Sequence, residues 1–295
     1  MNIIEVDSCN DAYLEIGKKL INNPEYIVTP RDYKTYELHN MVILIKNPYN
    51  RLVKNVHRKL SLKYLVGEFL WYERASNKLQ EISYYSKFWN MISDDGITSN
   101  SSYGKIIYEE KEKECSQWTF VKKELEKDKN SRRALMVISS FKPSHINTKD
   151  MPCTVGIQYM IRDNKLHMTV WMRSNDLYLG FCYDAAIFTI WQEKLLIELN
   201  RTYSDLTMGT YTHFATSMHI YEKNFLEVKK SIDSEYDNFG HELFNMPRIE
   251  KIGTITEVQK LEKNIRENNI DEIDEIDEID DDFGKWLVKC LNYEY

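Results

Sequence analysis

The sequence predicts an α/β protein, because stretches with the composition of β-strands and stretches with the periodicity of α-helices both recur along its 295 residues. Hydrophobic residues make up 42% of the chain, which is ample for a packed core. The most informative stretch runs from Pro152 to Asp184, where a cysteine, an arginine and two spaced acidic residues lie on adjoining strand and turn segments. We expect one domain over residues 1–265, followed by an acidic spacer and an aromatic tail over residues 266–295.

Charge and cysteine content exclude several classes of protein. The net charge is −7, but without the nine carboxylates of the run Asp271–Asp282 the remaining 37 acidic residues face 39 basic ones. This balance favours no nucleic-acid surface and leaves room for a small anionic ligand. The five cysteines are scattered, so we expect a reducing cytoplasm and no metal site. No apolar run reaches the roughly eighteen residues of a membrane span, so we expect no membrane partner.

The first part of the chain alternates between predicted helices and strands. A helix is expected over residues 10–20, and a strand over residues 35–46, which are rich in β-branched and large apolar side chains. Residues 60–71 carry a helical apolar stripe with Glu68 in its middle. Considered alone, Glu68 is expected on the wet face of this helix. An inside position would raise its pKa and suit proton transfer.

Two polar breaks with aromatic flanks follow this helix. Residues 82–89 are rich in aromatic side chains, among them Trp89, and residues 93–96 predict a turn. In the second break, residues 100–104, Gly104 permits close approach of the backbone. Surface connection is the simpler interpretation of both breaks, and a pocket rim with a phenol from Tyr103 is the alternative. Residues 109–129 then predict a solvated helix.

Arg132 and Arg133 precede an apolar strand predicted over residues 134–139. Most such pairs are surface charge, but guanidinium groups also donate paired hydrogen bonds to phosphate. Residues 153–162 and 166–172 flank a good turn sequence and predict a β-hairpin whose first strand begins at Cys153. An isolated cysteine is usually a small buried hydrophobe. If the arginine pair or Arg173 lies near Cys153, the pKa of its thiol falls and it becomes a nucleophile.

The second part of the chain begins with a long, mostly buried helix predicted from Asp184 onward, with Asp184 at its N-cap. A strand is expected over residues 208–220 and a helix over residues 222–233. The strand histidines His213 and His219 have no metal-site spacing, and a lone strand histidine is more often structural. A charged helical segment from Ile255 precedes the acidic repeat, whose composition is typical of a spacer.

Several motifs, taken in order, resemble one known family over roughly residues 31 to 230. They are Glu68-Phe-Leu-Trp71, Trp89, Tyr103-Gly104, Ser131-Arg132-Arg133, Pro152-Cys153, Arg173-Ser174-Asn175-Asp176 with Leu179-Gly180, and His219-Ile220-Tyr221. This set resembles the thymidylate synthase family, and within it the deoxycytidylate 5-hydroxymethylases of T-even bacteriophages. Three departures from true synthases carry the narrower resemblance: Thr154 after the cysteine, Met172 before the arginine, and Asp184 in place of the asparagine that reads the pyrimidine.

The resemblance implies a thymidylate synthase-like α/β fold, in which a twisted mixed β-sheet carries helices on one face. The other face of the sheet would pack against a second copy in a homodimer. Strands that are apolar on both faces, such as residues 134–138, fit this arrangement.

The resemblance also implies a reaction, the conversion of dCMP to 5-hydroxymethyl-dCMP with 5,10-methylenetetrahydrofolate and water. Cys153 as a thiolate would add to pyrimidine C6 and make C5 carbanion-like. Asp184 would accept from the cytosine amino group and share a proton with the ring nitrogen. Glu68 would organise water and proton transfers, and Tyr103 would lie beside the reacting ring. The nucleotide phosphate would be bound by Arg132, Arg133, Arg173 and Ser174, with Arg132 and Arg133 reaching from the other subunit. The sugar would be bound by His219 and Tyr221, and the folate would be contacted by Trp89 and Asp176.

Alternatives to this assignment stay open. A thymidylate synthase or a dUMP hydroxymethylase would tolerate Asp184 only if it were mainly a helix cap. A non-catalytic member would bind only a nucleotide or a partner, although Cys153, Glu68 and the arginines together argue against this. Arg31 lies near the position of the family's N-terminal phosphate arginine, but the match there is loose. A viral origin, and with it a host cytoplasm, follow only from the resemblance.

Overall fold

The computed structural model describes residues 2–109, 115–140, 146–234, 240–267 and 279–293, so most of the predicted acidic spacer lies outside the described residues. Contacts divide the chain into two units. Unit 1 comprises Met1–Leu60, Val121–Val137 and Cys153–Phe244, and unit 2 comprises Ser61–Phe120, Ile138–Pro152 and Asn245–Tyr295.

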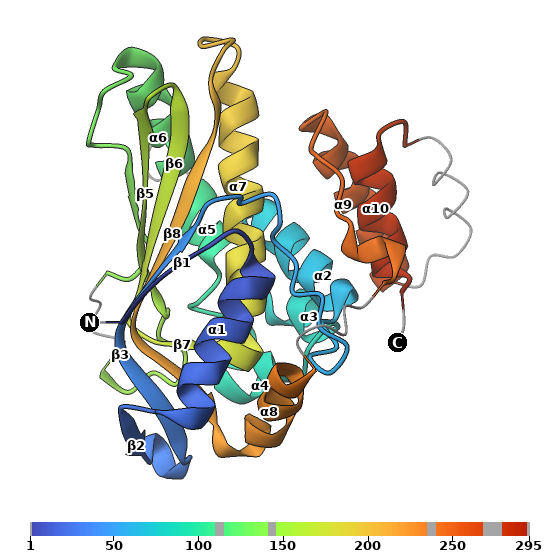
Figure 1. Cartoon of the computed structure of the whole chain (residues 1–295). Helices are drawn as coiled ribbons and strands as arrows, with labels where there is room; N and C mark the ends of the chain where they lie inside the picture. The colour runs from blue at the N-terminus through green and yellow to red at the C-terminus, as the bar shows by residue number, and fades with distance from the viewer. Residues whose placement is uncertain (1, 110–114, 141–145, 235–239, 268–278, 294–295) are drawn as a thin grey trace. The chain divides into compact units, whose positions relative to one another are not determined.

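Unit 1 is built on a mixed β-sheet (Figure 1). Its strands are β1 (Asn2–Val6), β2 (Tyr26–Val28), β3 (Thr35–Ile45), β4 (Leu135–Val137), β5 (Thr154–Arg162), β6 (Lys165–Met172), β7 (Asn175–Asp176) and β8 (Thr207–Tyr221). Their order is β1-β3-β8-β6-β5-β4, while β2 pairs with β3 and β7 with β8. β1 runs parallel to β3, and β6 and β7 run parallel to β8, whereas the other pairs are antiparallel.

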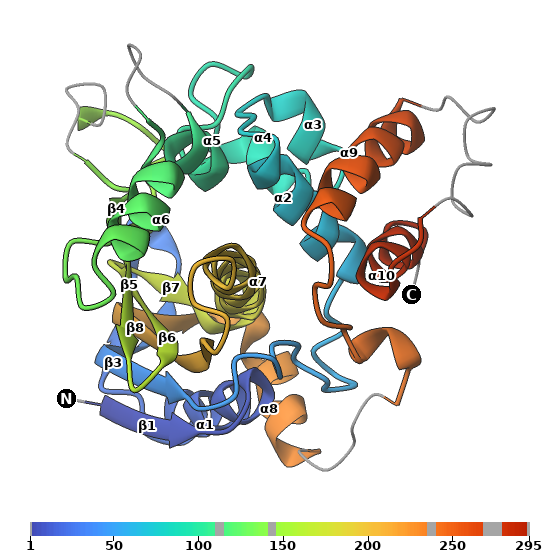
Figure 2. The ribbon, with the colours of Figure 1, turned by 90° about the horizontal axis from the view of Figure 1, so that it is seen from above.

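Helices cover one face of this sheet. The helices α1 (Cys9–Asn22) and α7 (Cys182–Leu199) contact each other and the central strands, as Figure 2 shows from above, and α8 (Phe225–Asp233) packs on α1. Alternate residues of β6, from Leu166 to Met172, are buried under them, as period-two alternation requires. The predicted α/β fold with helices on one face of a mixed sheet is therefore confirmed.

The hairpin of β5 and β6 forms where the sequence predicts it. Asp163 and Asn164 have φ values of 48° and 59°, the left-handed backbone that a two-residue hairpin turn needs. The pairing of Thr154 with Met172 closes the other end of the hairpin. The residues just before β5 and just after β6 are therefore neighbours. The short helical turns of unit 1 are η1 (Pro30–Asp32), η3 (Leu177–Phe181), η4 (Glu222–Asn224) and η5 (Glu242–Phe244).

Unit 2 is arranged around α2 (Leu62–Glu73), which confirms the helix predicted over residues 60–71. Ser61 caps α2, since its hydroxyl accepts from the amide of Tyr64 at 3.2 Å. The helix predicted over residues 109–129 is only partly present: α5 ends at Tyr108, residues 110–114 lie outside the described part, and α6 begins at Gln117. The helices other than α2 are α3 (Leu79–Ser83), α4 (Phe88–Ile92), α5 (Tyr103–Tyr108), α6 (Gln117–Lys127, which continues into unit 1), α9 (Gly253–Arg266) and α10 (Asp282–Leu291).

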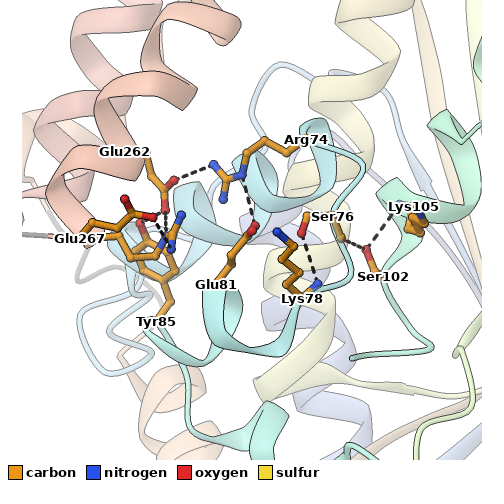
Figure 3. A network of polar contacts seen from close by, with 10 residues as sticks. Arg74, Ser76, Lys78, Glu81, Tyr85, Ser102, Lys105, Glu262 and Glu267 are labelled. Atoms are coloured by element: carbon orange, nitrogen blue, oxygen red, sulfur yellow. Dashed lines mark hydrogen bonds and ion pairs between the residues drawn. The ribbon is translucent and has the colours of Figure 1, made fainter. Parts of the chain in front are cut away.

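The C-terminal helices pack against α2. Figure 3 shows Glu262 of α9 directed at Arg74 and Tyr85. Its fully buried carboxylate accepts from Arg74 Nη1 at 2.6 Å, from the Tyr85 hydroxyl at 2.7 Å and from Arg266 Nε at 3.2 Å. The helix α10 adds an apolar face that includes Phe283 and Trp286. Phe283 and Trp286 are thus part of the core of unit 2.

Candidate active site

Cys153 and Arg173 lie side by side at the open end of the β5–β6 hairpin. The Arg173 amide donates to the Cys153 carbonyl at 2.9 Å, and Arg173 Nη2 lies 3.6 Å from Cys153 Sγ. Cys153 is partly exposed. A guanidinium beside a sulfur favours the thiolate, which is the nucleophilic form of cysteine. The arrangement is thus suited to covalent catalysis.

Tyr221 ends β8 next to this pair. Burial raises the pKa of Tyr221, the charges of Asp176 and Cys153 act in the same direction, and the guanidinium of Arg31 opposes them through its charge and a hydrogen bond. The charge and the hydrogen bond of Arg31 place its side chain beside Tyr221. In the sequence, Arg31 matched the family's N-terminal phosphate arginine only loosely. Arg31 has φ of 52°, so the loop before β3 turns sharply at this residue.

His219 and Asp176 are brought together by the pairing of β7 with β8, where they are direct partners. Burial raises the pKa of Asp176, and the charge of His219 opposes this rise. Asp176 Oδ1 accepts from the amides of Tyr178 and Leu179, both at 2.7 Å. Its Oδ2 is buried without a hydrogen-bond partner among the described residues. This oxygen is therefore suited to accept from an N–H group of a ligand.

Asp184 is the third residue of α7, and the helix has Phe181 at its N-cap. The prediction that Asp184 caps this helix is wrong, because its carboxyl group is engaged elsewhere: Oδ2 accepts from Asn175 Nδ2 at 2.8 Å. The acid that caps a helical turn here is Asp176. Burial raises the pKa of Asp184 to about 7, although the Asn175 hydrogen bond lowers it. Asp184 can thus both accept and donate near neutral pH.

The remaining residues with an implied phosphate role lie at the surface. Ser174 is partly exposed and follows Arg173 directly. The Arg133 side chain is 76% exposed, with its Nε 3.8 Å from Glu124 Oε1. Arg132 is also exposed, and its carbonyl accepts from Gln158 Nε2 at 2.9 Å. The structure gives the arginine pair no contact with Cys153 among the interactions of the described residues.

Unit 2 holds the other residues with an implied catalytic role. Glu68 is 7% exposed, so the expectation that it faces water is wrong. The helices α3, α5, α9 and α10 pack against α2. The Tyr72 hydroxyl donates to Glu68 Oε1 at 3.1 Å, and the Tyr72 ring stacks on Tyr103 with centroids 5.3 Å apart. A side chain on Gly104 would lie 1.9 Å from the Tyr72 carbonyl oxygen, which confirms the predicted close approach.

Trp89 belongs to the aromatic cluster of unit 2. It is 6% exposed, meets the Trp71 ring edge-on at 5.2 Å and donates through Nε1 to the Tyr64 hydroxyl at 3.2 Å. The Trp89 ring is therefore held rigidly on α4. Among the described residues there is no cluster of three or more His, Cys, Asp or Glu side chains that could hold a metal ion. The described helices include none long and apolar enough to cross a membrane.

Comparison with known proteins assigns the family. A family model described as thymidylate synthase matches residues 12–269. The chain belongs to the thymidylate synthase family. Thermostable thymidylate synthase A from Bacillus subtilis has the same fold, with a TM-score of 0.60 and 19% identity over 77% of this chain and 84% of that one.

Relatives within the thymidylate synthase family carry three different names. A putative thymidylate synthase of Methanocaldococcus jannaschii is 31% identical, over 78% of this chain and 96% of that protein. The deoxycytidylate 5-hydroxymethyltransferase of Enterobacteria phage T4 is 28% identical, over 73% of this chain and 87% of that protein. The deoxyuridylate hydroxymethyltransferase of Bacillus phage SP01 is 26% identical over 76% of this chain, which spans only 60% of that protein's length.

Two hydrogen-bond partners of implied site residues, one in each unit of this thymidylate synthase family member, were missed by sequence reasoning. Asn175 was quoted as part of a motif without a role, and only the fold places its amide on Asp184. Tyr72 has a local signal that could have been used, since it lies four residues after Glu68 on the same helix.

Proposed function

We propose that this chain is a pyrimidine nucleotide 5-hydroxymethylase that converts dCMP to 5-hydroxymethyl-dCMP. The observation that carries the proposal is the carboxyl group of Asp184, which accepts from Asn175 Nδ2 at 2.8 Å and whose pKa burial raises to about 7. A carboxyl group that is half protonated near neutral pH can accept from the 4-amino group of cytosine and donate to the ring nitrogen. An asparagine would instead match the 4-oxo group and ring N–H of uracil. The phage T4 relative with this activity in its name supports the same assignment.

Cys153 is the proposed nucleophile. Its thiolate, favoured by Arg173 Nη2 at 3.6 Å, adds to C6 of the pyrimidine, and the electron pair of the C5–C6 bond moves to C5. C5 then bonds to the one-carbon unit of the co-substrate, and loss of the C5 proton with departure of tetrahydrofolate leaves an exocyclic methylene group. Water adds to this group, and expulsion of the Cys153 thiolate restores the C5–C6 double bond. We assign to Glu68, with Tyr72 as its hydrogen-bond donor, the ordering of water and the proton transfers.

The one-carbon unit would come from 5,10-methylenetetrahydrofolate as co-substrate. Asp176 fits a role in holding it, because Asp176 Oδ2 is buried without a partner among the described residues and can accept from an N–H group. Trp89 offers a rigid ring for contact with the folate, and Tyr103 a phenol beside the reacting ring. We assign the nucleotide phosphate to Arg31, Arg173 and Ser174, and the sugar hydroxyl to His219 and Tyr221.

A homodimer is part of the proposal. The sheet face of unit 1 away from α7 carries exposed apolar side chains: Trp171 is 50% exposed, Leu135 45% and Val137 47%. A large exposed apolar face is typical of an interface. In such a dimer Arg132 and Arg133 would reach the phosphate of the partner subunit's site. We expect Trp171→Asp to convert the dimer to a monomer in sedimentation velocity, and a wild-type monomer would contradict the proposal.

A dUMP hydroxymethylase is the second candidate, because the Bacillus phage SP01 relative carries that name. A thymidylate synthase is the third, on the likeness to the Methanocaldococcus protein. The decisive experiment incubates the enzyme with dCMP or dUMP and methylenetetrahydrofolate. Mass spectrometry identifies the nucleotide product, and absorbance follows dihydrofolate, which only a synthase forms. We expect 5-hydroxymethyl-dCMP without dihydrofolate. Formation of dTMP and dihydrofolate from dUMP would overturn the proposal.

The catalytic role of Cys153 has a separate test. Cys153→Ala should reduce turnover by at least about a thousandfold while nucleotide binding persists, because only the covalent step is removed. Isothermal titration with dCMP measures the binding. Ordinary turnover by this variant would restore the non-catalytic alternative, in which the family member only binds a nucleotide.

A further inference from the structure

Among the described residues, the one hydrogen bond of the Asn175 side-chain amide goes to Asp184. Asn175 belongs to β7, is 4% exposed, and donates through Nδ2 to Asp184 Oδ2 at 2.8 Å. Its own Oδ1 is buried and has no hydrogen-bond partner among the described residues. A buried amide is costly unless its hydrogen bonds are made. Retaining Asn175 in this place therefore points to a function of the bond to Asp184.

The surrounding backbone is shaped around this bond. Gly180 lies in the turn between β7 and α7, and an added Cβ there would be 2.9 Å from Asn175 Nδ2 and 3.3 Å from Asp184 Oδ2. Any side chain at this position would displace one of the two groups. The pairing of β7 with β8, with Asn175 opposite Met218, fixes the backbone of Asn175.

A neutral carboxyl group alone does not distinguish cytosine from uracil. Its proton can sit on either oxygen, so it can present an acceptor and a donor in either order. Cytosine presents a donor at its 4-amino group and an acceptor at its ring nitrogen, and uracil presents the reverse. Selection therefore requires something that decides which oxygen of Asp184 carries the proton. The N–H of Asn175 points at Oδ2, which favours an unprotonated Oδ2 and leaves the proton to Oδ1.

We propose that Asn175 is the positioning residue that sets the base preference of this enzyme, by keeping Asp184 Oδ2 an acceptor and confining the carboxyl proton to Oδ1. This inference rests on the proposed function, in which Asp184 faces the pyrimidine ring. With Oδ2 opposite the 4-amino group and Oδ1 opposite the ring nitrogen, as the proposal requires, this order matches cytosine. Without the amide, Asp184 would accept both bases.

The ionisable groups that influence Asp184 do not compete with Asn175. Among the described residues they are Cys182 on α7 and Tyr211 on β8. Burial raises the pKa of the Cys182 thiol and of the Tyr211 hydroxyl, so both stay uncharged near neutral pH. The Tyr211 hydroxyl is engaged with His213 Nδ1 at 2.7 Å, and burial lowers the pKa of His213 to about 3, so this group is neutral as well. The proton of Asp184 is therefore governed by Asn175.

The test compares Asn175→Asp and Asn175→Ala with the wild type in the full-length enzyme. Asn175→Asp keeps the shape of the side chain and removes the N–H donor. The measurements are kcat/KM for dCMP and for dUMP, and the pH dependence of kcat/KM for dCMP. We expect the ratio of the two kcat/KM values to fall by about tenfold in both variants, as for the loss of one buried hydrogen bond. The part of the pH profile of kcat/KM that follows the titration of Asp184 should move to higher pH, because the hydrogen bond from Asn175 lowers the pKa of Asp184 and is absent in the variants.

Asn55→Ala is the matched control. Asn55 is also 4% exposed, and its amide donates to the Ser231 carbonyl at 2.9 Å in the same unit. Its loss should lower the melting temperature and leave the dCMP to dUMP ratio unchanged. The inference would be overturned if the Asn175 variants kept the wild-type ratio of kcat/KM for dCMP and dUMP and the wild-type pH profile. It would also be overturned if Asn55→Ala changed this ratio as much as the Asn175 variants do. If Asn175→Ala does not fold, the isosteric Asn175→Asp decides. If the wild-type enzyme has a higher kcat/KM for dUMP than for dCMP, the proposed function itself is wrong. This outcome is distinguishable because it is measured before any variant is made.

Discussion

Arg173 Nη2 lies 3.6 Å from Cys153 Sγ, at the open end of a β-hairpin whose turn is at Asp163 and Asn164. The two residues are twenty positions apart in the chain and are adjacent because β5 and β6 are in register. A permanent positive charge thus lies beside Cys153, the one cysteine among the described residues of unit 1 that is not buried. The hairpin supplies the reactive centre of the proposed enzyme.

Arg173→Gln should reduce the rate at which iodoacetamide alkylates Cys153 at neutral pH by about tenfold, because the thiolate loses its adjacent cation. Peptide mass spectrometry measures the rate at each cysteine, with exposed Cys115 as the internal reference. Arg162→Gln, at the turn end of the same hairpin, is the control and should leave the rate unchanged. Equal rates in all three proteins would show that Arg173 does not activate Cys153.

Asp184→Asn should stabilise the protein at alkaline pH. The pKa of Asp184 is about 7 in the folded chain and 3.8 when unperturbed, so the folded state holds the proton more tightly. This contribution is fully present below about pH 4 and is lost as pH rises through about 7. The asparagine side chain does not titrate, so the variant lacks this pH-dependent contribution to stability. The difference in free energy of unfolding between variant and wild type should therefore grow by on the order of 2–4 kcal/mol between acid and alkaline pH.

Urea denaturation at about pH 4 and about pH 8 measures this difference, since groups common to both proteins cancel. Because Asp184 is partly exposed, the lower end of the range is the better expectation. A difference that is constant with pH would mean that Asp184 titrates alike in the folded and unfolded chain.

Tyr72→Phe should lower kcat by about tenfold with little change in KM for the nucleotide, because Glu68 loses a donor while the ring remains stacked on Tyr103. Tyr108→Phe is a matched control: its hydroxyl donates at 2.7 Å to Glu73 on the same helix. Steady-state kinetics of both variants provide the comparison. An equal loss in Tyr108→Phe would indicate a general disturbance of α2.

Glu262→Gln should destabilise the protein by about 3–5 kcal/mol, because a fully buried carboxylate that neutralises Arg74 and Arg266 loses its charge. Figure 3 shows these contacts joining α9 to the end of α2. Asp233→Ala removes an exposed pair with Lys229 at 2.9 Å and should cost less than about 1 kcal/mol. Guanidinium denaturation measures both. Equal small losses would mean that the Glu262 network does not hold α9 on α2.

The sequence by itself determined the elements whose signals are local. The turn residues Asp163 and Asn164 set the hairpin, and with it the meeting of Cys153 and Arg173. Apolar periodicity identified α2, and the ordered motifs identified the family. These features depend on neighbouring residues or on a pattern of residues in order, both of which can be read along the chain.

Only the tertiary structure decided the state of the acids. Glu68 was expected in water and is buried, because α3, α5, α9 and α10 pack around α2. Asp184 was expected to cap α7, but Asn175 on β7 holds its carboxyl group instead. The physical reason is that burial and hydrogen-bond partners come from segments distant in the chain. The pKa of an acid therefore depends on which segments pack around it, and no local pattern contains that information.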